Sequence, residues 1–175
     1  MKLLSETKAL ERLLKQKNDF REFVRDEYEH RAKDCLDCEV QGACCTDAHF
    51  VNVHITRLEA VQIQKAVEKL ENSREVFARV EETIEEYGLT DSAGSFEKTF
   101  ACPLFEKGTG CLVHERGKPI PCIQHACYEN KRDLPPGEVQ LNQERAVEQL
   151  NMRAYGNAWN WLPLPVWISK LEENL

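Results

Sequence analysis

The chain has 175 residues, a hydrophobic fraction of 42% and a formal net charge of −7. Its length predicts a single domain with one ordinary core. The negative charge argues against a non-specific nucleic-acid binder, which needs a basic face to neutralise phosphates. Charges interrupt the first apolar residues, and no stretch approaches the ~20 apolar residues of a membrane span, so we expect a cytoplasmic protein with no membrane partner.

The first part of the chain, residues 1–33, is expected to be helical. Apolar side chains recur there at helical spacing among charges, without Gly or Pro; they are Leu3, Leu10, Leu13, Leu14, Phe20, Phe23, Val24 and Tyr28. The sequence NDF, which begins at Asn18, could divide this region into two helices. A cluster of cysteines follows, in which Gly42 is expected to form a turn.

The middle of the chain alternates helix and loop signals. Residues 49–55 alternate apolar and polar side chains, which predicts a short strand. Thr56 and Glu59 match a capping box, and the predicted helix runs over 57–71. A second helix is predicted from Ser73 to Gly88, and residues 90–99 read as a loop.

The last third of the chain begins with an irregular segment that is rich in Gly and Pro. After the breaker at 133–137, a helix is predicted over 138–155. The tail, residues 157–175, carries all three tryptophans. The expected architecture is a mainly α single domain of helices packed around two irregular Cys-rich loops, with at most short strands, and its cysteine-cluster core spans 35–127.

Eight cysteines are the strongest chemical signal in the sequence. They favour metal ligation over disulfides, because a cytoplasmic chain of this size rarely keeps structural disulfides. Cys35 and Cys38 form a C-x-x-C pair, whose spacing lets two sulfurs turn toward one ion. The predicted metal ligands are Cys35, Cys38, Cys44, Cys45, Cys102, Cys111, Cys122 and Cys127.

Two histidines lie at ligand spacing from a cysteine, in Cys111-x-x-His114 and Cys122-x-x-His125. Because all-thiolate sets already complete the usual metal sites, we favour a role at the rim of a cluster for both histidines over ligation. His49 and His54 are expected to pack within the fold or to support the metal ligands from outside.

The order of the cysteines resembles that of a known family, the YkgJ-type cysteine-cluster proteins, which are described as zinc- or iron-chelating. The resemblance covers residues 35–127, through C-x-x-C, the adjacent pair Cys44-Cys45, and the later CPL, GC, KP and C elements. It implies a bound metal or an iron–sulfur cluster. Some members of that family resemble lysine N-methylases. His114, Lys118 and Ile123 differ from residues common in the family.

Several functions stay open at this point. Zinc in a structural role is slightly favoured, and an iron–sulfur cluster for electron transfer or redox sensing is the alternative. Whether the chain is an enzyme is undecided, because a reactive thiol would need a neighbouring base and metal ligation would consume both Cys/His pairs. A protein partner could bind the Trp-rich tail, although we expect its tryptophans to pack on the chain's own helices.

Overall fold

The computed structural model describes residues 3–33, 40–46, 51–128, 130–156 and 161–172. Helices dominate these residues, and every strand has two residues, so the predicted mainly α class is confirmed. The chain divides into two compact units, and each is built from two separate segments. Unit 1 comprises Met1–Gln41 and Pro119–Trp159, and unit 2 comprises Gly42–Lys118 and Asn160–Leu175. The organisation as a single domain stays a prediction.

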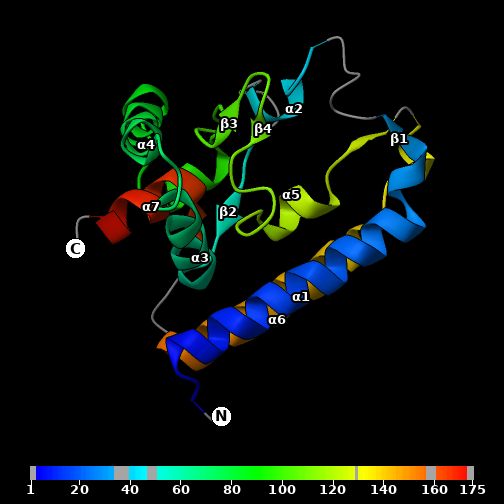
Figure 1. Ribbon diagram of the computed structural model, residues 1–175, viewed down its shortest axis with the longest axis horizontal. Coiled ribbons are helices and arrows are strands. Elements are labelled where there is room, and N and C mark those ends of the chain that lie inside the picture. The colour runs from blue at the N-terminus through cyan, green and yellow to red at the C-terminus, as the bar shows by residue number, and fades with distance from the viewer. Residues whose placement is uncertain (1–2, 34–39, 47–50, 129, 157–160, 173–175) are drawn as a thin grey trace. The chain divides into compact units, whose positions relative to one another are not determined.

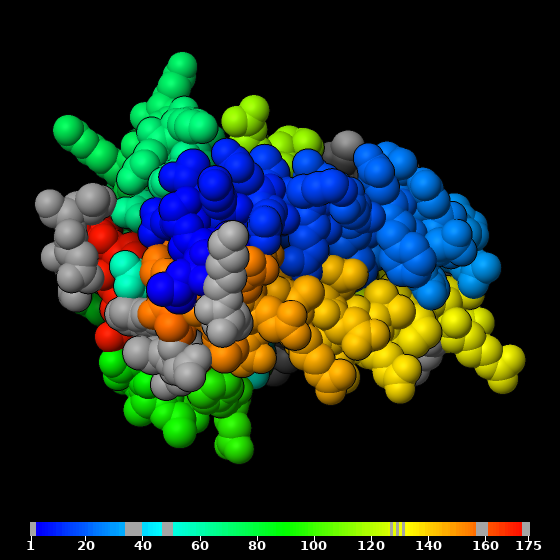
Figure 2. All heavy atoms as spheres, turned by 90° about the horizontal axis from the view of Figure 1, so that it is seen from below, coloured from blue at the N-terminus to red at the C-terminus, as the bar shows by residue number. Residues whose placement is uncertain are grey.

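Unit 1 is built on two long antiparallel helices, which lie side by side in both views (Figures 1 and 2). The start of one helix is tied to the end of the other: Leu4 N donates to Arg153 O at 2.9 Å, and the Tyr155 hydroxyl donates to the Glu6 carboxylate at 2.6 Å. The elements of unit 1 are α1 (Glu6–Glu27), η1 (Glu29–Arg31), β1 (Ala32–Lys33), α5 (Ile120–Gln124), β5 (Cys127–Tyr128), η4 (Lys131–Asp133) and α6 (Gly137–Tyr155).

Helix α1 runs through Asn18 without a break, so the suggested division into two helices is wrong. Its buried side chains, among them Leu13, Phe20 and Val24, repeat every three or four residues and form one continuous stripe. Asn18 lies on the exposed side, where an asparagine costs a helix only about 0.7 kcal/mol relative to alanine. Burial of the stripe therefore outweighs the weak local signal.

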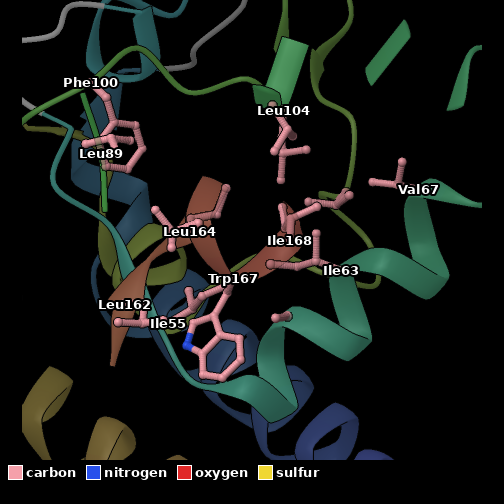
Figure 3. Close-up of a cluster of buried hydrophobic side chains, with 14 of the residues drawn as sticks. Ile55, Ile63, Val67, Leu89, Phe100, Leu104, Leu162, Leu164, Trp167 and Ile168 are labelled. Atoms are coloured by element: carbon pink, nitrogen blue, oxygen red, sulfur yellow. The ribbon is translucent and has the colours of Figure 1, made fainter. Parts of the chain in front are cut away.

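Unit 2 places helices around a compact apolar core (Figure 3). Its C-terminal helix α7 packs against both α3 and α4, and β2 pairs antiparallel with β6 through Ile55 and Leu162. The elements of unit 2 are α2 (Ala43–Thr46), β2 (His54–Ile55), α3 (Arg57–Val67), α4 (Ser73–Tyr87), η3 (Ala93–Glu97), β3 (Phe105–Glu106), β4 (Gly110–Cys111), β6 (Leu162–Pro163) and α7 (Leu164–Glu172).

The C-terminal tail is part of this core. Trp167 is only 3% exposed, and Figure 3 shows its indole beside α3, with Ile168 and Leu164 on the same helix. The expected intramolecular packing is therefore confirmed for Trp167, whereas Trp159 lies outside the described residues. Partner binding by the tail stays a prediction.

The predicted helices in the middle of the chain match the structure more closely than the predicted strand does. The capping box of Thr56 and Glu59 is present, and Gly88 ends α4 in a left-handed conformation (φ 57°). The helix after Thr56 ends at Val67, four residues before the predicted end. The strand expected over 49–55 is limited to His54–Ile55 within the described residues, because the Val51 carbonyl instead accepts from Phe100 N at 2.9 Å.

None of the helices within the described ranges is both long and apolar enough to cross a membrane.

Candidate functional site

The adjacent cysteines Cys44 and Cys45 lie on the short helix α2 of unit 2. Gly42 starts this turn with a φ of +76°, and its carbonyl accepts hydrogen bonds from the amides of Cys45 (2.7 Å) and Thr46 (2.8 Å). A left-handed φ favours glycine, so the predicted turn at Gly42 is confirmed. On a helical turn, the two neighbouring thiols point about 100° apart.

A direct backbone hydrogen bond joins the first cysteine cluster to the second. Cys102 N donates to Cys45 O at 2.7 Å. The chain then turns, with Phe105 N donating to Cys102 O at 3.2 Å, and enters the β3–β4 hairpin, where Phe105 is paired with Cys111. Cys45, Cys102 and Cys111 are thus linked through one short backbone network.

The thiol of Cys102 lies in a poorly solvated position. Burial raises its pKa to about 12, and the nearby Cys111 adds to the increase, whereas backbone groups of Leu104 and Phe105 and the positive charge of Arg79 oppose it. Without a metal, this sulfur is therefore a neutral thiol at physiological pH. A bound metal ion would take the place of its proton.

Arg79, on α4, approaches the same network from the side. One of its terminal nitrogens, Nη1, donates to Phe105 O at 3.5 Å. Its Nε is buried and has no hydrogen-bond partner among the residues that the structure describes. Sequence analysis did not single out Arg79, because an arginine on a polar helix carries no signal for a distant contact.

The remaining cysteines fall within the segments of unit 1. Cys122 lies on α5, and Cys127 lies on β5, where it pairs with Lys33 of β1. Cys35 and Cys38 lie outside the described residues. Of the described cysteines, unit 1 contains Cys122 and Cys127, and unit 2 contains Cys44, Cys45, Cys102 and Cys111.

The histidines within the described residues differ in their exposure. His114 and His125 are exposed, and His114 Nε2 is 4.0 Å from the Glu115 carboxylate. His54 stacks on Phe96, with ring centroids 4.5 Å apart. His49 lies outside the described residues. Packing within the fold is thus observed for His54.

The donor chemistry of unit 2 fits a thiolate-bound metal, although its geometry is incomplete. Among the described side chains, five cysteines form no disulfide: Cys44, Cys45, Cys102 and Cys111 in unit 2, and Cys122 in unit 1. Among the described residues, no three Cys, His, Asp or Glu side chains gather closely enough to hold an ion. The poorly solvated thiol of Cys102 and the unsatisfied Nε of Arg79 nevertheless suit an anionic sulfur centre, because a thiolate accepts hydrogen bonds better than a thiol does.

Comparisons with protein-family models, with curated proteins and with solved structures return no match for this chain.

Proposed function

We propose that this is a cysteine-cluster metal-binding protein, with Cys45, Cys102 and Cys111 at the centre of a thiolate site in unit 2. The observation that carries the proposal is the 2.7 Å hydrogen bond from Cys102 N to Cys45 O, together with the pairing of Phe105 and Cys111. These contacts link the backbones of three of the predicted ligands, which lie far apart in the sequence. The other five cysteines remain candidates on the sequence pattern and on the YkgJ-type resemblance.

Zinc in a structural role is the favoured metal. The cysteine-bearing segments of unit 2 contain only a one-turn helix and two-residue strands, so they have few ladder hydrogen bonds of their own. Tetrahedral thiolate coordination supplies the cross-links that such segments lack, and the free energy of metal binding then becomes free energy of folding.

An iron–sulfur cluster is the alternative, because four cysteines also suffice to bind a cubane. The chain lacks the regularly spaced cysteine run of ferredoxins, which favours zinc. Cytoplasmic location agrees with either metal, since thiols stay reduced in that compartment.

Elemental analysis and an absorption spectrum of anaerobically purified protein test this proposal. We expect zinc in near-stoichiometric amounts and no visible absorption; iron, sulfide and a broad visible absorption would select the alternative. Cys102→Ser should lose metal, whereas the control Ala101→Ser places a serine side chain at the neighbouring position and should keep it. Metal-free protein with intact disulfides, from gentle preparations, would refute metal binding.

A further inference from the structure

Arg79 is held against the strand that carries the cysteine network. Its Nη1 reaches Phe105 O at 3.5 Å, and Phe105 is the residue paired with Cys111. On the helix itself, the Thr83 hydroxyl donates to Arg79 O at 2.7 Å. The guanidinium therefore contacts the cysteine-bearing hairpin.

The Nε atom of Arg79 is the unusual part of this side chain. Nε is buried without a hydrogen-bond partner among the described residues, and none of the salt bridges formed by those residues includes Arg79. A buried, charged donor without an acceptor is costly, and native proteins retain few of them. This arrangement calls for an anionic acceptor nearby.

Phe105, which Arg79 contacts, is hydrogen-bonded through its backbone to Cys102 and paired with Cys111. The charge of Arg79 is close enough to interact electrostatically with the thiol of Cys102, and Cys111 is a second sulfur in the same surroundings. A protonated thiol accepts hydrogen bonds only weakly. Once a metal has replaced the proton, the sulfur is anionic and can accept a charge-assisted hydrogen bond from the guanidinium.

We propose that Arg79 is a positioning residue for the thiolate centre of unit 2, donating its Nε–H to a metal-bound sulfur of Cys102 or Cys111 and offsetting the negative charge of the thiolates. This inference rests on the proposed function. It gives the site an outer-shell partner on α4, a helix without cysteines, and thereby couples metal binding to the packing of that helix.

The test compares Arg79→Met, which keeps a similar stem without charge or donors, with Arg79→Lys, which keeps the charge. Arg74→Met removes an exposed arginine from the same helix and is the matched control. Zinc affinity is measured by competition with a chromophoric chelator, and the sulfur environment by the charge-transfer bands of the cobalt-substituted protein. Urea unfolding of the metal-free forms separates metal binding from folding.

We expect Arg79→Met to weaken zinc binding by about 10- to 100-fold, the usual effect of losing an outer-shell partner. Its sulfur-to-cobalt band should shift to lower energy, because the thiolate loses a hydrogen bond. Arg79→Lys should restore most of the affinity, and Arg74→Met should match the wild type. Metal-free Arg79→Met should be at least as stable as metal-free wild type, because an unsatisfied buried donor has been removed.

Three results would overturn the inference: unchanged zinc affinity in Arg79→Met, equal losses in the Met and Lys variants, or a loss of affinity matched by destabilisation of the metal-free protein. If the wild type itself binds neither zinc nor cobalt, the proposed function fails and this inference fails with it. If the wild type and Arg79→Met bind metal equally well, only the role of Arg79 is refuted.

Discussion

Gly42 lies directly against the aromatic ring of Phe105, and only the absence of a side chain allows this contact. A Cβ added at Gly42 would overlap three carbons of the ring. Gly42 begins the turn that carries Cys44 and Cys45, and Phe105 pairs with Cys111 on the hairpin. The contact therefore holds the two cysteine-bearing segments of unit 2 together, in addition to the hydrogen bond between Cys45 and Cys102.

Gly42→Ala should separate these two segments. The added methyl group combines overpacking with a left-handed φ of +76°, and we expect the free energy of unfolding to fall by about 3 kcal/mol. Gly108→Ala is the matched control: Gly108 has a φ of +88°, but a Cβ there would meet nothing within 4 Å. Its loss should be about 1 kcal/mol, from backbone strain alone. Equal losses in urea denaturation would show that the contact with Phe105 has no energetic weight.

Thr56→Ala should destabilise unit 2 at the start of α3. The Thr56 side chain accepts from Glu59 N, and the Glu59 carboxylate accepts from Thr56 N, both at 3.4 Å. Both residues are buried, so water cannot replace the lost partner, and we expect a loss of about 1–2 kcal/mol. Thr56→Ser keeps the hydroxyl and should recover most of the stability. If both variants unfold at the same urea concentration, methyl packing rather than capping accounts for the loss.

Local signals in the sequence predicted the helices because their causes are local. The capping box at Thr56, the glycine stop at Gly88 and the buried stripe of α1 each act within a few residues. The long helix ending at Gly156 follows the same rule: predicted over 138–155, it is observed as Gly137–Tyr155. The helix breaker at 133–137 and the glycine at Gly156 were enough to predict where this helix begins and ends.

Long-range relationships could not be predicted in this way. The pairing of Ile55 with Leu162 joins two-residue strands, which are too short to show any periodicity. The hydrogen bond between Cys102 and Cys45 uses main-chain groups that every residue possesses. The sequence therefore carried no information about which cysteines are neighbours, or about Arg79, and the set of metal ligands stays a prediction.

Acidification should weaken unit 2 through His54. Burial holds the pKa of His54 below its usual range, although hydrogen bonds with the backbone of Asn52 and Ser95 oppose this effect. Above about pH 6.5, the imidazole is neutral in both the folded and the unfolded chain. As the pH falls below this value, the unfolded chain takes up the proton first, so the free energy of unfolding decreases until the pH passes below the folded-state pKa.

Urea midpoints measured at about pH 7.5 and about pH 5 test this prediction. The wild type should lose more stability on acidification than His54→Asn does, and His125→Asn, which changes an exposed histidine, should behave like the wild type. Since other groups also titrate in this range, the decisive quantity is the difference between variants. A His54→Asn protein with the full acid-induced loss would contradict the prediction.

The adjacent cysteines Cys44 and Cys45 should differ in their contribution to metal binding. Two sulfurs on one zinc lie only ~3.8 Å apart, as tetrahedral geometry with ~2.3 Å bonds requires. Side chains of neighbours on a helical turn diverge by about 100°, which works against their sharing one ion. Cys45 is the neighbour whose carbonyl binds the amide of Cys102, so we assign Cys45 to the site in unit 2.

Zinc-to-protein ratios of the single and double serine variants decide between the two cysteines. Cys45→Ser should lose the same metal equivalent as Cys102→Ser, and the double variant of these two should lose no more than either. Cys44→Ser should keep its zinc, or it should lose a zinc ion other than the one lost by Cys45→Ser. The double variant of Cys44 and Cys45 should therefore contain no more zinc than Cys45→Ser alone. Thr46→Ser, on the same turn, should retain all of its metal. If Cys44→Ser and Cys45→Ser lose the same amount of zinc, and the double variant loses no more, both sulfurs bind one ion. The turn of α2 would then have to open when metal binds.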